Sequence, residues 1–311
     1  MKESVLPLMS GWYRKAFHAP ADWKGKRVSV EFDGVYRDAT VYLNGHKLGT
    51  DPYGYTAFTF DLTPELDFSG TNVLAVRVDN SAQPNSRWYS GSGIYRHVRV
   101  EVTDPTHVAH WGVFVTTPDA TSSSAKVSIR TRVANEASEA SDVTIETTLL
   151  DDTGKKIGST RSKLTIAPAK DEDAAQGIVV AHPALWSPES PTLYRAVSTI
   201  SKSGKAIDQM TTPFSIRSLA WSTEKGLLLN HKSIKLTGGS VHHDNGPLGA
   251  AAFDRAEERR VARQPLHPRR SHLDCYGLPG RIRHRRVAIR HPATSKNGGR
   301  NVRHDGEHRH D

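Results

Sequence analysis

The stretch VRVDNSAQPNSRWYSGSGIYRHVRVEV (76–102) decides the fold of the first part of this chain. It begins and ends with runs in which valine alternates with charged residues, a two-residue period that is typical of half-buried β-strands. Asn, Ser, Pro and Gly residues crowd its middle and favour a loop. We therefore expect two antiparallel strands joined by a long loop in an all-β domain.

The same pattern extends over residues 11–103, where Gly, Pro, Asn and Asp separate short alternating runs. The runs that show it best are 12–17, 27–32, 74–78 and 98–102. Asn44-Gly45 lies between two such runs, and this dipeptide tolerates the positive φ angles of a two-residue type I′ hairpin. We interpret residues 1–104 as one antiparallel β-domain with a hairpin at 44–45.

A second set of strand-like runs follows Pro105. The seven runs are 113–116, 126–133, 143–150, 164–166, 178–180, 193–200 and 214–216. Seven short strands in a segment of this length are typical of an immunoglobulin-like β-sandwich. We assign residues 105–217 to such a domain, with a loop at 135–141.

The pattern changes again after residue 217. GLLLNHKSIKLTGGSVHHDNG (226–246) indicates a hairpin that leads into a buried strand, and AAAFDRAEERRVA (250–262) indicates the start of a helix. A strand followed by a helix is how a β/α unit begins. Residues 218–262 are therefore expected to form a first β/α unit.

The last segment, 263–311, differs in composition from everything before it. Eleven Arg and one Lys stand there against four acidic residues, so +8 of the formal charge of +9 lies in this segment. Without an apolar period it cannot bury enough apolar surface to offset its ordering entropy, and we expect a disordered basic tail. The abrupt change near Ala262 indicates a shift of reading frame.

Composition also bears on compartment and membranes. Cys275 is the only cysteine, so no disulfide framework forms within the chain. Residues 1–20 hold no apolar run of signal-peptide length, and no eighteen apolar residues follow one another anywhere. We expect a soluble, cytoplasmic protein with no membrane partner.

Two features of the tail could indicate other functions, nucleic-acid binding and metal binding. The run RIRHRR (281–286) could neutralise phosphates, but it has neither interleaved aromatic residues nor an expected fold, so we predict no nucleic-acid partner. His304, His308 and His310 could capture a transition metal, but a structural zinc site needs four convergent ligands and a second shell. We predict no metal site.

Several motifs resemble glycoside hydrolase family 2, the family of many β-galactosidases. GWYRKAF (11–17), DPYGYTAFTFDLTPEL (51–66) and the stretch at 76–102 resemble its jelly-roll, galactose-binding-like domain. LWSPESPTLYR (185–195) is similar to a motif of its immunoglobulin-like domain, and residues 214–261 resemble the beginning of its (β/α)8 barrel. The resemblance implies an all-β chain with a jelly-roll sandwich, an immunoglobulin-like sandwich and the first β/α unit of a truncated barrel.

The resemblance also implies a reaction, the hydrolysis of terminal β-galactosides with retention. Retaining glycosidases need two carboxyl groups about 5 to 5.5 Å apart. In the family both are Glu residues on later barrel strands, which do not appear here, so we expect a chain without activity of its own. The alternative is a non-catalytic module that binds carbohydrate or complements a separate barrel fragment.

Family members commonly form homo-oligomers and use magnesium through barrel residues. The residues that would hold magnesium have no counterpart in this sequence, so no cofactor is assigned to this chain. A β-galactoside or a related carbohydrate is the expected partner, and the intact enzyme is expected to form a homo-oligomer.

Five residues are candidates for substrate contact by resemblance. His242 and Asp244 follow the first expected barrel strand, on the active face of such barrels. Either could equally be a turn residue. Asn85, Arg87 and Trp88 lie in the loop that reaches toward the active site in the family, and Trp88 could instead pack at a domain junction.

Four further residues receive a structural interpretation. Tyr53 and Tyr55 could line a sugar groove, but alternating aromatic residues before a strand more often pack a sheet, so we expect them in the core. Asn135-Glu136 superficially resembles the acid/base motif of the family, and we expect it in a solvated loop of the second sandwich.

Overall fold

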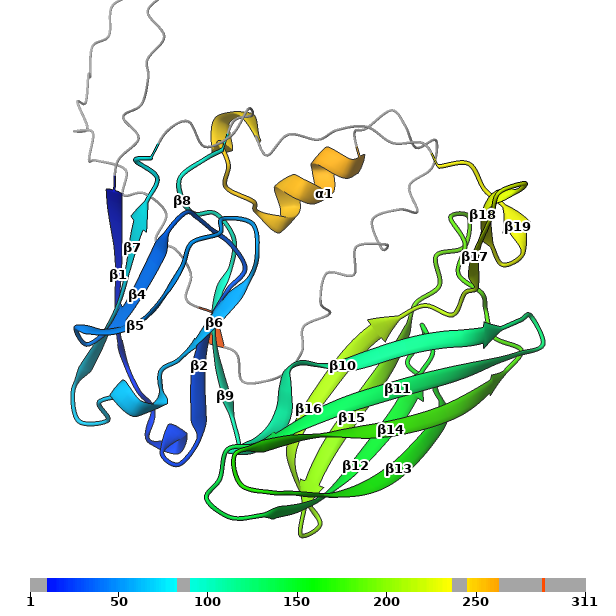
Figure 1. The fold of residues 1–311 in the computed structure, drawn as a ribbon, viewed down its shortest axis with the longest axis horizontal. Helices are drawn as coiled ribbons and strands as arrows, with labels where there is room; N and C mark the ends of the chain where they lie inside the picture. Colours follow the sequence, from blue (N-terminus) through cyan, green and yellow to red (C-terminus); the bar gives the residue numbers. More distant parts are fainter. Residues whose placement is uncertain (1–9, 83–89, 237–244, 263–286, 289–311) are drawn as a thin grey trace, which may run out of the picture.

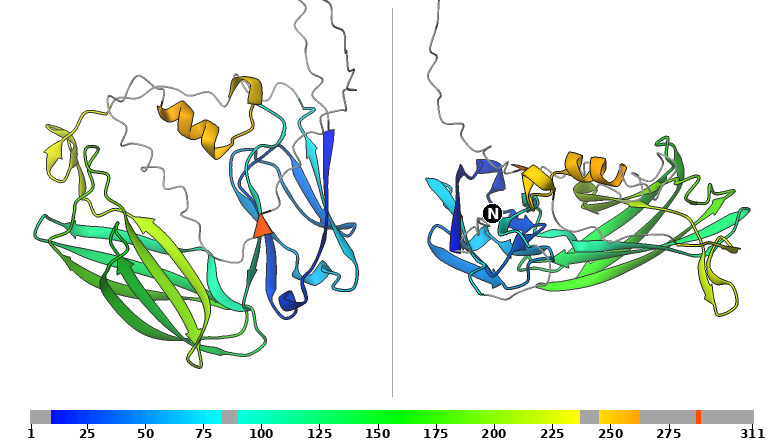
Figure 2. Two further views of the ribbon diagram at one scale, coloured as in Figure 1. Left: turned by 180° about the vertical axis from the view of Figure 1, so that it is seen from behind. Right: turned by 90° about the horizontal axis from the view of Figure 1, so that it is seen from above.

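The computed structural model describes residues 10–82, 90–236, 245–262 and 287–288, and nearly all of its regular structure is β-strand. Figures 1 and 2 show two β-sandwiches side by side, joined where one long strand of the second sandwich follows the last strand of the first. The expectation of a nearly all-β chain in two sandwiches is confirmed.

The first sandwich is built from two antiparallel four-stranded sheets. One has the order β1 (Ser10–His18), β7 (Thr71–Asp79), β4 (Ala39–Leu43), β5 (His46–Asp51). The other has the order β20 (Val287–Ala288), β9 (Val98–Thr103), β2 (Arg27–Phe32), β6 (Phe58–Asp61), and a short pair joins β3 (Val35–Tyr36) to β8 (Gly93–Ile94). The four runs predicted from alternation lie within β1, β2, β7 and β9.

Alternation works in this sandwich because one face of each sheet is buried. Val28, Val30 and Phe32 of β2 are fully buried, and Phe32 stacks on Phe58 of β6 with ring centroids 4.9 Å apart. Burying a side chain of this size stabilises the fold by about 1.5–3 kcal/mol relative to leaving it exposed. The hairpin at Asn44-Gly45 is confirmed, with φ angles of 52° and 88°.

The second sandwich contains seven strands; six predicted runs fall on strands of their own, whereas the run 214–216 shares only Phe214 with the seventh. One sheet has the order β10 (Thr106–Ala120), β11 (Ser124–Asn135), β14 (Lys170–Ala181). The other has the order β13 (Lys156–Ile166), β12 (Ser141–Leu150), β15 (Tyr194–Lys202), β16 (Lys205–Phe214). Four of these strands, β10, β13, β14 and β16, are much longer than the runs predicted for them.

The third part of the described chain holds a small sheet and a helix. The sheet has the order β17 (Leu219–Ser222), β18 (Gly226–Leu229), β19 (Lys232–Ser233), and α1 spans Asp254–Ala262. Three short 3-10 helices complete the structure at η1 (Ala21–Trp23), η2 (Thr63–Glu65) and η3 (Gly246–Leu248). The expected hairpin and helix are thus present.

Two predictions fall wholly or partly outside the described residues. The buried strand expected between the hairpin and His242 extends into residues 237–244, which are not described. The tail, 263–311, is described only at Val287 and Ala288, which pair with Val100 and Arg99 of β9. Among the described residues no helix is both long and apolar enough to cross a membrane.

Candidate functional site

The five candidate residues occupy two segments that the structure does not describe. Asn85, Arg87 and Trp88 lie within 83–89, and His242 and Asp244 lie within 237–244. The residues on either side of both segments are described, and they show where each segment leaves and rejoins the fold. We call the described residues at the ends of a segment its base, and the candidate site is built from these two bases.

The base of the first segment is closed by a buried asparagine. Asn80, which is 1% exposed at the end of β7, donates from Nδ2 to Ser92 Oγ at 2.7 Å, just before β8. Beside it, Asp79 Oδ1 accepts hydrogen bonds from the hydroxyl and the backbone N–H of Ser81, and these bonds lower the pKa of Asp79 to about 2. Asn80 and Ser92, which flank the loop, are thus held together.

The base of the second segment is tied to the helix that follows it. Asn245 Nδ2 donates to Glu257 Oε1 at 2.7 Å and to Ala251 O at 3.2 Å. Arg260 Nη1 donates to Asn245 Oδ1 at 3.3 Å. Glu257 and Arg260 belong to α1, so Asn245, the first described residue after the segment 237–244, is fixed to the helix.

The two bases meet on the first sandwich. Ala252 N donates to Tyr95 O at 2.8 Å, and His97 Nε2 lies 3.4 Å from Asp254 Oδ2 at the start of α1. Gly91 packs so closely on Ala250 that a β-carbon at position 91 would lie 2.2 Å from the Ala250 Cβ. Figures 1 and 2 show the corresponding arrangement, with α1 and η3 beside β8. The structure thus brings the bases of both candidate segments together.

Four tyrosines lie next to these bases, and they correct one expectation. Tyr53 and Tyr55 are 58% and 37% exposed, so they are not core residues. The two rings contact each other with centroids 5.9 Å apart, and Tyr55 also contacts Tyr36 with centroids 5.1 Å apart. The reason is Gly54, where a β-carbon would lie 2.1 Å from the Tyr36 ring, so this turn runs over the ring and its tyrosines pack on it rather than inside a sheet.

The fourth tyrosine links this cluster to the base of the first segment. Tyr95 donates from its hydroxyl to Gly54 O at 2.9 Å, and its own carbonyl accepts the bond from Ala252. Burial raises the pKa of Tyr95. The exposed rings of Tyr53 and Tyr55 therefore belong to the same face as the two bases, which the sequence alone did not reveal.

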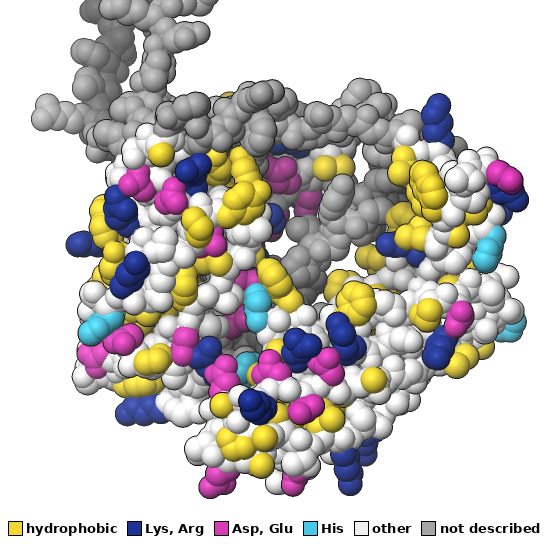
Figure 3. Space-filling view, viewed as in Figure 1, with side chains coloured by type: hydrophobic (Ala, Val, Ile, Leu, Met, Phe, Trp, Pro, Cys, Tyr) yellow, Lys and Arg dark blue, Asp and Glu magenta, His cyan; other side chains and the backbone are white. Residues whose placement is uncertain are grey.

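A network of charged residues lies on the outer face of β2 and β9. Arg99 Nη1 lies 2.5 Å from Asp33 Oδ1 and 3.6 Å from Glu31 Oε2, and His97 Nδ1 lies 3.1 Å from Asp33 Oδ2. His110 of β10 lies 3.8 Å from Glu31. Magenta and cyan side chains border the hollow between the two sandwiches in the space-filling view (Figure 3).

The pKa values of two carboxyl groups in this network are shifted in opposite directions. Burial raises the pKa of Glu31, and the neighbouring Glu101 and Asp33 raise it further. Burial also acts to raise the pKa of Asp33, but the hydrogen bond and charge of Arg99 outweigh it and lower that pKa. A raised and a lowered carboxyl pKa side by side is the pattern of many hydrolase sites.

Here the pattern has a structural cause. Glu31 is directly opposite Arg99 in the β2–β9 register, and the guanidinium that lowers the Asp33 pKa bonds directly to that carboxylate. His97 carries the network on to Asp254 of α1. The network therefore ties the helix to the sandwich. Within the described ranges no cluster of three His, Cys, Asp or Glu side chains could hold a metal ion.

Asn135 is not a solvated loop residue. It ends β11, is 1% exposed, and donates from Nδ2 to Glu139 O at 2.8 Å and Ile166 O at 3.0 Å. Its Oδ1 accepts from Thr106 Oγ1 at 3.1 Å. Glu136, which follows in the loop, pairs with Arg27 Nε at 2.7 Å. The two residues hold strands and domains together, and they do not form an acid/base motif.

Comparison with family models covers both sandwiches. The model for the glycosyl hydrolase 2 galactose-binding domain-like fold matches residues 8–110, and the model for glycosyl hydrolases family 2 matches residues 106–217. The matched residues thus form a continuous span from the first sandwich to the end of the second.

Comparison with individual proteins gives relatives named for glycoside hydrolysis. The beta-galactosidase BoGH2A of Bacteroides ovatus is 43% identical over 257 residues, which are 83% of this chain and 30% of that protein. A beta-glucuronidase of Formosa agariphila is 32% identical over 265 residues, with 78% of this chain and 27% of that protein covered. The chain therefore spans less than a third of the length of these relatives.

Solved structures agree with this result. A glycosyl hydrolase family 2 member from Bacteroides cellulosilyticus superposes with a TM-score of 0.79 at 42% identity. The match covers 82% of this chain and 35% of that protein's chain. The beta-glucuronidase of Bacteroides uniformis superposes with a TM-score of 0.75 at 30% identity, with 81% and 32% covered.

Proposed function

This chain belongs to glycosyl hydrolase family 2, and we propose that its two sandwiches are the substrate-positioning part of a retaining glycosidase of the β-galactosidase type. The names of the relatives, which include both β-galactosidases and β-glucuronidases, support a β-glycoside as the substrate. The chain spans less than a third of the length of those relatives. We therefore propose the glycosidase activity for a whole protein that contains these sandwiches.

The observation that carries this proposal is the meeting of the two bases. The loop with Asn85, Arg87 and Trp88 and the segment with His242 and Asp244 are both anchored where Ala252 bonds to Tyr95. Amide, guanidinium and imidazole groups are suitable partners for sugar hydroxyls, and a sugar ring packs on aromatic side chains such as Trp88, Tyr53 and Tyr55. We assign substrate contact to these two segments.

We do not assign the hydrolytic step to the described residues of this chain. A retaining glycosidase needs a nucleophilic carboxylate and an acid about 5 to 5.5 Å from it. Within the described residues, the carboxyl pair with the most suggestive pKa shifts is Glu31 and Asp33, and Arg99 already neutralises it. The 311-residue chain is therefore expected to recognise a β-glycoside without hydrolysing it.

The test is an assay of the purified 311-residue chain with a chromogenic β-galactoside and the matching β-glucuronide. We expect no release of the chromophore above the rate in buffer. A variant with Glu31→Gln is assayed in parallel, because it removes the one carboxyl group with a raised pKa in the described network. Turnover that this variant abolishes would overturn the assignment and place the chemistry in the network.

A further inference from the structure

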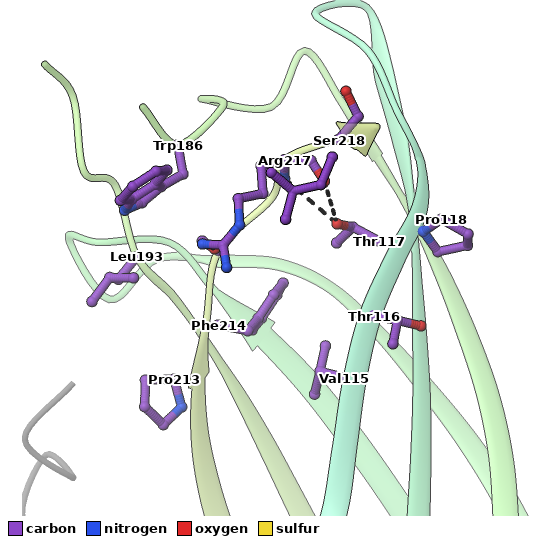
Figure 4. Close-up of a pocket in the computed structure, with 12 residues that line it drawn as sticks. Val115, Thr116, Thr117, Pro118, Trp186, Leu193, Pro213, Phe214, Arg217 and Ser218 are labelled. Atoms are coloured by element: carbon purple, nitrogen blue, oxygen red, sulfur yellow. Dashed lines mark hydrogen bonds between the residues drawn. The ribbon is translucent and has the colours of Figure 1, made fainter. Parts of the chain in front are cut away.

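A pocket of about 600 Å³ opens on the second sandwich, where β16 leads into β17. It is lined by residues 115–118 of β10, Trp186, Leu193, residues 213–215 and residues 217–219. Figure 4 shows the Arg217 side chain inside it, with the guanidinium between Trp186 and Phe214. A volume of this size is typical of sites for small organic ligands.

Arg217 is held in place by several neighbours. Its guanidinium carbon lies 5.0 Å from the centroid of the Trp186 ring, and Nη1 donates to Ser215 Oγ at 2.6 Å. Its backbone is fixed too, because Thr117 Oγ1 donates to Arg217 O at 2.9 Å. An arginine oriented in this way loses little further side-chain entropy when it binds a ligand.

The charge of Arg217 has no acidic partner in the described part of the chain. Arg99 and Arg132 bond to Asp33 at 2.5 Å and to Asp173 at 2.9 Å, whereas no described carboxylate forms an ion pair with Arg217. The guanidinium donates one hydrogen bond, to Ser215, among the described residues. Its remaining donors match a carboxylate, which arginine binds in a bidentate manner.

The side chains around the guanidinium determine which chemical groups the rest of a ligand can carry. Val115, Leu193, Pro213 and Phe214 form the apolar part of the lining, and Thr116, Thr117, Ser215 and Ser218 bring hydroxyl groups to it. The apolar part of a ligand would lie against the four apolar side chains, while its charged group would reach the guanidinium. We propose that this pocket binds small carboxylates that carry an apolar ring, with the carboxylate on Arg217 and the ring over Phe214 and Leu193. This proposal does not depend on the proposed glycosidase function.

Isothermal titration of the 311-residue chain tests the proposal with a graded set of probes. We expect naphthylacetate to bind more tightly than phenylacetate, and phenylacetate more tightly than acetate, because a larger ring buries more of the apolar wall. Naphthylethanol, which has the ring but no charge, should bind at least about tenfold more weakly than naphthylacetate, the loss that a missing charge-assisted hydrogen bond produces.

Two variants and one control locate the binding. Arg217→Gln removes the cation, and Ser215→Asp places a carboxylate of the protein beside Nη1 while it keeps the arginine on Trp186. Both should weaken naphthylacetate about tenfold or more. The control Arg161→Gln removes an exposed cation of β13 and should leave binding unchanged. Circular dichroism and thermal unfolding check that all three variants fold.

Four outcomes would overturn the proposal. Equal binding of acetate and naphthylacetate would show an anion site without ring recognition, and equal binding of naphthylethanol would show apolar adsorption. Unchanged binding in both folded variants would place the ligand elsewhere. Tighter binding of glucuronate than of naphthylacetate would make the pocket a site for acidic sugars. None of these results bears on turnover of β-glycosides, so the two proposals fail separately.

Discussion

Arg99 is the residue on which the charged network depends. Its side chain is 18% exposed and lies against Glu31 and Asp33, whose side chains are 8% and 16% exposed. Two nearly buried carboxyl groups, two positions apart along the chain, would repel each other and lack solvent, and the guanidinium offsets both costs. Removal of the cation should therefore cost more than a typical surface ion pair contributes.

We predict that Arg99→Met lowers the free energy of unfolding by about 3 kcal/mol at neutral pH, the usual cost of leaving a buried charge unpaired. The contribution of Asp33 is present above its ordinary pKa of 3.8 and is lost as the pH falls through its lowered pKa in the fold. The difference between the variant and the parent should therefore shrink below pH 3.8. Urea unfolding at a series of pH values measures it.

Arg161→Met is the matched control for this prediction. Arg161 pairs with Glu146 across β12 and β13, but its side chain is 66% exposed, and exposed pairs contribute about 0–1 kcal/mol. If Arg99→Met destabilises the chain no more than Arg161→Met does, the network has no structural role. The carboxyl groups of Glu31 and Asp33 would then need another explanation.

Single residues also show where sequence reasoning ends. The sequence indicated Asn44-Gly45 correctly, because a hairpin of two residues is a local event with a known preference for this dipeptide. It misplaced Asn135, whose partners Thr106 and Ile166 are about thirty positions away along the chain. It also misplaced Tyr53 and Tyr55, because their exposure depends on the packing of Gly54 against Tyr36.

At the scale of elements, strands were predictable where one face carries almost only apolar residues. The run 27–32 matches β2, whose interior positions are valine and phenylalanine. Strand β13 carries Gly, Ser, Thr, Arg and Lys over 158–163, and β14 carries Lys, Asp and Glu over 170–173. Their outer faces are exposed and their inner faces contain polar residues such as Gln176, which bonds to Thr147 at 2.6 Å, so alternation is weak. Pairing with neighbouring strands makes them longer.

The contact between the first sandwich and the segment 245–262 is the element-scale feature that carries the proposed function. Gly91→Ala tests it, because the new methyl group would overlap the Ala250 side chain. We expect the segment to move off the sandwich at a cost of about 1–3 kcal/mol, the usual cost of overpacking. Hydrogen exchange should show about tenfold or greater loss of protection at the Ala252 amide, which bonds to Tyr95.

Gly177→Ala is the control for this variant. Gly177 lies on β14, and a β-carbon there would meet nothing within 4 Å. It should leave the protection of Ala252 unchanged. Equal protection of Ala252 in both variants would show that the segment is not held against Gly91, and the common base of the two candidate segments would lose its support.

For the molecule as a whole, the sequence indicated the order of the parts but not their contacts. Motifs resembling a known family and the alternation of residues indicated two sandwiches and a helix, and the structure confirms them. Nothing in the sequence showed that the segment leading into α1 packs against the residues that flank β8, because that contact joins residues about 160 positions apart. The face that unites the candidate segments is a property of this contact.

The most direct test of this account is a nuclear magnetic resonance titration of the isotope-labelled 311-residue chain with a non-hydrolysable thio-β-galactoside. The account predicts that the amide signals of Asn80, Ser92, Tyr95 and Ala252 shift together, because these residues form the common base of the two segments assigned to the substrate. Shifts confined to the second sandwich, or no shifts at saturating sugar, would contradict it.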